Sequence, residues 1–125
     1  MKKLAFMCAA LVAMAAPAWA DGDAEAGAKV FNKCKTCHEN EKGVNRVGPT
    51  LKGVVGRKTA SVEGFKYSDA MAKKGAEGQV WDEPTLTVYL KDPKAMVPGT
   101  KMSFAGLKKE DEIEDVIAFL EEAAK

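Results

Sequence analysis

The sequence predicts an all-α fold for one small domain, on three observations. Ile113, Val116, Ile117 and Leu120 recur at the i, i+3, i+4, i+7 spacing of an amphipathic helix. No stretch shows the alternation of apolar and polar residues that is typical of a half-buried strand. Segments that carry glycine and proline separate the helical patterns. Residues 21–125, which are 105 of the 125 in the chain, have the size of a single domain.

The first 20 residues have the pattern of a secretory signal peptide and are therefore left out of the predicted fold. Lys2 and Lys3 form a charged start, and an apolar run over 4–16 follows. This run is shorter than the roughly 20 residues that a transmembrane helix needs. Ala18-Trp19-Ala20 provides a small-x-small cleavage pattern. We expect export and cleavage after Ala20.

Two helices are expected in the first two thirds of the chain. Asp23 to about Lys33 is rich in alanine and has acids in its first turn, where they stabilise a helix dipole. Ser68 is a suitable N-cap for a short helix that extends through Lys74, with Gly75 just past its end.

Two more helices are expected before the C-terminus. Asp82-Glu83-Pro84 is typical of a helix start, and Pro93 ends that helix near Asp92. Glu110, Asp111 and Glu112 form the first turn of the last helix, and Phe119 widens its apolar stripe. Loops that carry glycine and proline are expected over 43–57 and 94–106.

The segment Cys34-Lys35-Thr36-Cys37-His38 is typical of the attachment site of a c-type haem. Two thiols at this spacing can add to the two vinyl groups of one porphyrin, and the adjacent imidazole can ligate its iron. Outside the first 20 residues the chain has no other cysteine, and His38 is its only histidine. We therefore expect one haem c, covalently bound through Cys34 and Cys37.

Other uses of this cysteine pair fit the sequence less well. Tetrahedral zinc needs four ligands, and the chain has no second Cys/His pair. A thioredoxin-like dithiol belongs in a βαβ setting, which no segment predicts. A disulfide across two intervening residues is unusual.

Haem attachment also agrees with export, because it takes place on the outer side of bacterial membranes, and we expect a periplasmic protein. A buried haem would supply much of the apolar core, so the apoprotein should fold poorly.

The iron then needs a sixth ligand or keeps an open face. A second histidine is excluded by count, which leaves Met71, Met96 and Met102. Met71 lies in a short predicted helix, where a packing role is the more common one. Pro98-Gly99-Thr100 makes the chain turn just before Met102. The residues alone favour Met102 over Met96 only mildly, and both stay candidates.

An ordered series of motifs resembles the class I c-type cytochromes, close to bacterial cytochrome c2 and mitochondrial cytochrome c. The resemblance extends from Gly27 to Leu120, and each motif is weak by itself. Their order and spacing together are specific. The series is Cys34-Lys35-Thr36-Cys37-His38, Gly48-Pro49-Thr50-Leu51, Gly56-Arg57-Lys58, Phe65-Lys66-Tyr67-Ser68-Asp69-Ala70, Trp81, Tyr89-Leu90, Pro98-Gly99-Thr100-Lys101-Met102-Ser103-Phe104 and the terminal helix.

The resemblance implies a small cytochrome c fold, with crossed terminal helices and short helices and loops around one covalent haem. It implies that His38 and Met102 are the axial ligands and that the Pro49 carbonyl accepts the Nδ1 proton of His38. Tyr89 would hydrogen-bond near the Met102 sulfur, and Phe104 would cover the haem edge. Arg57, Tyr67 and Trp81 would bind or neutralise the haem propionates. Gly27, Phe31 and Val116 would pack where the terminal helices cross.

With histidine and methionine both bound, the iron has no open coordination site, which favours one-electron transfer over catalysis. The resemblance implies a carrier between membrane redox complexes, from a quinol–cytochrome c oxidoreductase to a photosynthetic reaction centre or a terminal oxidase. A haem sensor would need an open or easily displaced distal site. A peroxidase-like enzyme would need a distal acid–base group, for which no second histidine exists.

Charge is distributed unevenly along the chain. Residues 29–109 hold 16 Lys and Arg against 8 Asp and Glu, while residues 110–125 hold 7 acids and 1 base. If the termini pack together, the surface around the haem is basic and steers the protein toward acidic docking surfaces of membrane complexes. No nucleic-acid-binding motif occurs, and a monomer is expected. The candidates for the basic ring are Lys35, Lys94, Lys101 and Lys108.

Overall fold

The computed structural model describes residues 22–123, so the expected signal peptide and its cleavage site lie outside the described residues. The described chain forms five helices and no strand; Lys58 and Val80 make one isolated bridge. The prediction of an all-α fold is therefore confirmed. No helix among residues 22–123 is long and apolar enough to cross a membrane. The helices are α1 (Ala24–Phe31), α2 (Asp69–Ala76), α3 (Glu83–Lys91), α4 (Pro93–Met96) and α5 (Glu110–Ala123).

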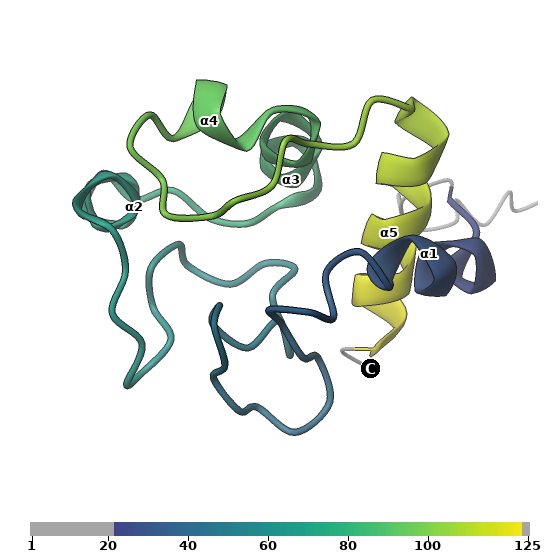
Figure 1. Cartoon of the computed structure of the whole chain (residues 1–125), viewed down its shortest axis with the longest axis horizontal. Helices are drawn as coiled ribbons and strands as arrows, with labels where there is room; N and C mark the ends of the chain where they lie inside the picture. The colour runs from purple at the N-terminus through teal and green to yellow at the C-terminus, as the bar shows by residue number, and fades with distance from the viewer. Residues whose placement is uncertain (1–21, 124–125) are drawn as a thin grey trace, which may run out of the picture.

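The five helices surround the middle of the molecule together with one long segment that contains no helix. Figure 1 shows α1 and α5 crossing at one end, with α2, α3 and α4 along one edge. Residues 32–68 form the opposite edge without a helix. Parts of the chain that are far apart in sequence therefore face one another across the middle of the fold.

The two terminal helices cross in close contact. Asp23 caps α1 through its carboxylate, and its own main-chain N–H donates to Asp115 of α5 at 2.8 Å. The rings of Phe31 and Phe119 pack with their centroids 5.2 Å apart. Burial of this apolar interface is the main stabilising contribution at this end of the molecule. The predicted stripe is buried throughout: Ile113, Val116, Ile117 and Leu120.

Helix α2 begins where the sequence predicts but extends further. Ser68 is the N-cap, and its hydroxyl accepts the Met71 N–H at 3.1 Å. Gly75 was expected to follow the helix, yet it is a buried residue inside it, so that prediction is wrong. A Cβ on Gly75 would lie 2.5 Å from the carbonyl oxygen of Thr59, which means that this glycine allows close packing. The left-handed turn is made instead at Gly78, with φ +89°.

Helices α3 and α4 begin with the same short pattern. Asp82 caps α3 and accepts the Thr85 N–H at 2.9 Å, and Asp92 caps α4 and accepts the Ala95 N–H at 3.2 Å. A proline follows each cap within the first turn. The expectation of a loop from residue 94 is therefore wrong at its start. Pro93 ends α3 and also begins the next helix, because a proline fits the first turn of a helix.

Candidate functional site

Cys34, Cys37 and the only histidine of the chain share one turn directly after α1. Helix α1 ends at Phe31, two residues earlier than expected, and turns follow through residue 37. The main-chain N–H groups of Cys37 and His38 both donate to the carbonyl of Cys34, at 3.1 and 2.9 Å. Cys34 and Cys37 form no disulfide, and burial raises the pKa of Cys34. This turn therefore presents two thiols and an imidazole within a short distance along the chain.

The imidazole of His38 is held in one tautomer. Its Nδ1 donates to the carbonyl oxygen of Pro49 at 2.7 Å, which leaves the lone pair on Nε2. Burial lowers the pKa of His38, and the nearby charge of Arg57 acts in the same direction. A neutral imidazole with a free Nε2 is the form that binds iron. A Cβ on Gly48 would lie 2.3 Å from Cε1 of the ring, so only glycine fits beneath it.

The carboxylate of Glu39, which belongs to no recognised motif, directly follows the histidine. Glu39 accepts the main-chain N–H groups of Glu41 and Lys42 on one oxygen, at 2.9 and 2.7 Å. Its other oxygen accepts the N–H of Val44 at 2.7 Å and the hydroxyl of Thr50. Hydrogen bonds from Thr50 and then from Lys42 lower the pKa of Glu39 to about 2. No sequence pattern predicts the role of this residue, because its four donors come from a loop without a regular pattern.

Hydrogen bonds order the region around Met102. The hydroxyl of Tyr89 donates to the Met102 sulfur at 3.6 Å, and the Met102 N–H donates to the Thr100 hydroxyl at 3.2 Å. Burial raises the pKa of Tyr89, and its ring packs on Trp81 with centroids 4.7 Å apart. Met96 is also partly buried against the core, but its sulfur accepts no hydrogen bond within the described chain. The structure thus gives Met102 an ordered setting that Met96 lacks.

Arg57 carries the only buried side-chain nitrogen or oxygen among residues 22–123 that has no hydrogen-bond partner. Its Nη1 donates to the carbonyls of Thr50 and Lys52, at 2.9 and 3.1 Å, while its Nε has no acceptor. Burial lowers the pKa of this guanidinium. A buried N–H of this kind is costly unless a bound group accepts it. An anionic group, such as a haem propionate, fits the unpaired Nε.

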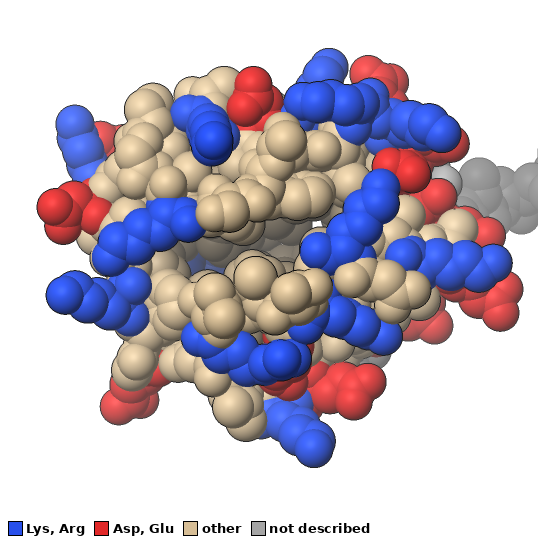
Figure 2. Space-filling view, viewed as in Figure 1, with Lys and Arg blue, Asp and Glu red and all other residues tan. Residues whose placement is uncertain are grey.

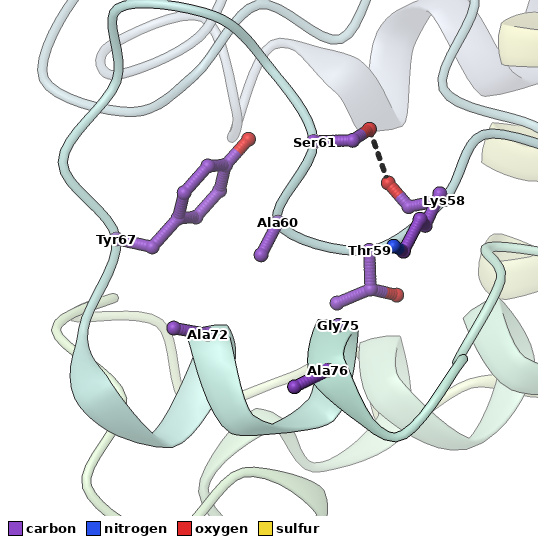
Figure 3. Close-up of a pocket in the computed structure, with 8 residues that line it drawn as sticks. All are labelled: Lys58, Thr59, Ala60, Ser61, Tyr67, Ala72, Gly75 and Ala76. Atoms are coloured by element: carbon purple, nitrogen blue, oxygen red, sulfur yellow. Dashed lines mark hydrogen bonds between the residues drawn. The ribbon is translucent and has the colours of Figure 1, made fainter.

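Tyr67, the second residue expected near the propionates, lies beside a cavity of about 310 Å³. Its hydroxyl accepts the Val62 N–H at 3.0 Å and still has a proton to donate. Figure 3 shows the tyrosine on one side of this cavity and the small side chains of α2 on another, with the Ser61 hydroxyl bonded to the Lys58 carbonyl on the loop. The cavity lining holds no cysteine, histidine or methionine. This cavity is therefore separate from the proposed iron ligands.

The face shown in Figure 2 is hollowed in its middle. Uncharged side chains border the hollow, lysine and arginine side chains lie around it, and most acidic side chains lie at the periphery. Several apolar residues pack against the core while staying partly exposed, among them Leu51, Met71, Leu90 and Phe104. A large flat apolar group would cover such side chains. A haem fits this set of groups. Its vinyl groups match the two thiols, its iron matches Nε2 of His38, and a propionate matches the unpaired Nε of Arg57.

Comparisons with known proteins agree with this fit. The family model for cytochrome c matches residues 24–124. The chain is 54% identical over 98 residues to cytochrome c2 iso-2 of Magnetospirillum molischianum, which covers 78% of this chain and 95% of that protein. It is 50% identical over 105 residues to cytochrome c-550 of Nitrobacter winogradskyi, with 83% and 94% covered.

A solved structure shows the same architecture. Cytochrome cH from Methylobacterium extorquens superposes with a TM-score of 0.74 at 49% sequence identity, covering 81% of this chain and 99% of that one. A match over nearly the whole described chain includes the cysteine pair and the helices that frame it. The chain therefore belongs to the cytochrome c family, whose members are electron-transfer proteins rather than enzymes, and it holds one haem c covalently through Cys34 and Cys37.

Proposed function

We propose that this cytochrome is a periplasmic one-electron carrier whose haem iron is ligated by His38 and Met102. The observation that carries the proposal is the pair of supporting contacts, Nδ1 of His38 on the Pro49 carbonyl and the hydroxyl of Tyr89 on the Met102 sulfur. The first contact engages Nδ1 and leaves the lone pair of Nε2 for iron. The second uses one of the two lone pairs of the Met102 sulfur and leaves the other for iron. When bound, the haem supplies the reversible change between ferric and ferrous iron.

The chain's own residues would hold the haem in one orientation. Arg57 and Tyr67 offer hydrogen-bond donors for its carboxylates, and Trp81, which is 7% exposed, closes the apolar wall beside them. Phe104 is partly buried and would exclude water from the haem edge. A thioether ligand in a dry pocket stabilises ferrous iron and raises the reduction potential. With His38 and Met102 both bound to the iron, no site would remain open for a small ligand or a substrate, so catalysis at the iron would be disfavoured.

A single spectroscopic comparison tests the ligand assignment. Ferric haem with a thioether ligand has a weak far-red absorption band. We expect this band in the wild-type protein and in Met96→Ala, and we expect it to disappear in Met102→Ala. Met96→Ala is the matched control, since it removes the same side chain from the neighbouring segment. Loss of the band in Met96→Ala alone would transfer the ligand role to Met96.

The proposed partners are membrane redox complexes with acidic docking surfaces, such as a quinol–cytochrome c oxidoreductase as donor and a photosynthetic reaction centre or terminal oxidase as acceptor. The similarity to cytochrome c2 and cytochrome c-550 supports this part of the proposal. The cations proposed for the ring around the haem edge are all exposed: Lys35, Lys94, Lys101 and Lys108. The predicted signal peptide with cleavage after Ala20 supports periplasmic location.

Charge reversal tests the docking surface. Lys101→Glu should slow association with such a complex at low ionic strength, and the difference from wild type should disappear at high salt. Lys29→Glu is the control, because it makes the same charge change on α1, at the end of the molecule where acidic α5 crosses. Equal slowing by the two variants would mean that net charge rather than a localised ring governs association.

A further inference from the structure

The hydrogen bond from His38 to Pro49 closes a loop over residues 37–51, and the Asn45, Arg57 and Glu39 side chains all bond to that loop. Among them, Glu39 makes the largest number of these hydrogen bonds. Gly48 N–H donates to the Cys37 carbonyl at 2.8 Å, and Leu51 N–H donates to the Glu39 carbonyl at 2.7 Å. Pro49 lies between these two links. The position of the Pro49 carbonyl over Nδ1 is therefore set by how residues 48–51 are tied to residues 37–39.

The Glu39 carboxylate joins the beginning of this loop to its end. One carboxylate oxygen accepts two N–H groups of the turn at residues 41–42, and the other accepts the N–H of Val44 and the hydroxyl of Thr50. Thr50 directly follows Pro49 and is 6% exposed. A carboxylate with four donors orders loop 39–50 more strongly than any neutral group of the same size.

We propose that Glu39 is a positioning residue for the haem iron, acting through Thr50 and Pro49 to hold the hydrogen bond that His38 donates from Nδ1. This inference rests on the proposed function, in which His38 ligates the iron. A strong hydrogen bond from Nδ1 makes Nε2 a better electron donor and favours ferric iron. Loosening the loop weakens this bond and favours ferrous iron.

Glu39→Gln tests the proposal because an amide cannot replace the carboxylate. The amide oxygen of glutamine can accept two of the four donors, but its NH2 group then faces the other two N–H groups. Glu41→Gln is the matched control. It removes the same charge two residues away, and the exposed Glu41 carboxylate accepts no hydrogen bond within the described chain. Any effect of charge alone on the iron is therefore present in both variants.

Two measurements on the purified holoprotein separate positioning from stability. The first is the ratio of reduced to oxidised protein at a fixed solution potential. We expect this ratio to be roughly threefold higher in Glu39→Gln than in Glu41→Gln. A change of that size corresponds to part of the free energy of one hydrogen bond. The second is the exchange rate of the His38 Nδ1 proton with solvent, measured by NMR. We expect faster exchange in Glu39→Gln and no change in Glu41→Gln.

Thr50→Val provides an independent test that keeps the side-chain shape and removes the hydroxyl, with its bonds to Glu39 and to the Lys52 N–H. Both measurements should change in the same direction as in Glu39→Gln, by a smaller amount, and the double variant should show less than the sum. Equal behaviour of Glu39→Gln and Glu41→Gln would overturn the proposal. If Glu39→Gln does not mature with haem, unchanged values in Thr50→Val would overturn it. Failure of the proposed function itself is distinguishable, because the wild-type spectrum would then lack His/Met ligation.

Discussion

Gly27 of α1 lies so close to Asp115 of α5 that a Cβ on this glycine would be 1.9 Å from the Asp115 carbonyl oxygen. The same Cβ would be 2.8 Å from Cβ of Phe119. The crossing of the two helices therefore depends on the absence of a side chain at position 27. Backbone atoms cannot move aside as a flexible side chain can, so any substitution must separate the helices.

Gly27→Ala should destabilise the holoprotein by about 3 kcal/mol, the upper end for overpacking a well-packed interface. Unfolding by denaturant, followed by tryptophan fluorescence, measures this loss. Gly53→Ala is the control, since φ is +67° there and no atom lies within 4 Å of the added Cβ. It should cost only about 1 kcal/mol of left-handed backbone strain. Equal losses would show that the helix contact is not the cause.

Ser68→Ala should destabilise the protein by about 1 kcal/mol, because it removes the hydroxyl that accepts the Met71 N–H in the first turn of α2. Ser68→Thr keeps a hydroxyl at this position and should retain most of the stability. Denaturant unfolding of the two variants beside wild type measures the difference. If both variants lose the same amount, packing of this buried side chain rather than capping is responsible.

The cap of α3 should make stability depend on acid pH. Hydrogen bonds from Thr85, first from its hydroxyl and then from its N–H, lower the pKa of Asp82. The stabilisation is therefore fully present above the ordinary aspartate pKa of 3.8 and is lost as pH falls through the lower pKa of the folded state. The difference in melting temperature between wild type and Asp82→Asn should shrink as pH falls.

Glu63→Gln is the control for the pH experiment. Its exposed side chain makes no hydrogen bond within the described residues. The melting-temperature difference between wild type and Glu63→Gln should therefore stay small and nearly constant over the same range of pH. A constant difference for Asp82→Asn as well would contradict a role for the ionised cap.

Tyr89→Phe should lower the reduction potential. Without the hydroxyl, the Met102 sulfur keeps more electron density for the iron, which stabilises the ferric state. The ratio of oxidised to reduced protein at a fixed potential should rise by roughly threefold, since a neutral hydrogen bond contributes about 1 kcal/mol. Redox titration measures the ratio, and the far-red band should persist to show that Met102 stays bound. An unchanged potential would mean that this contact does not influence the iron.

Local sequence patterns predicted the helix starts well, because caps act over a few residues. Ser68 is the N-cap that its sequence predicts. Asp23 and Asp82, which were expected at the starts of their helices, are also N-caps. The predictions that were wrong, at Gly75 and just after Pro93, have one cause: each of these residues has two possible roles. Glycine either makes a left-handed turn or allows close approach, and proline either ends a helix or begins one. Which role applies depends on contacts with distant segments, such as the Thr59 carbonyl beside Gly75.

The sequence by itself determined the chemistry of the cofactor and the order of α1, α2, α3 and α5. The spacing of Cys34, Cys37 and His38 is a property of five consecutive residues, so no folding was needed to recognise it. Only the tertiary structure decided which distant groups support these residues. Long-range packing creates the contact of the Pro49 carbonyl with His38 and that of the Tyr89 hydroxyl with Met102. It also leaves the Nε of Arg57 buried without an acceptor. The hydrogen bonds of Glu39 were also decided by the tertiary structure. They lie in an irregular loop, which produces no repeating pattern of residues in the sequence.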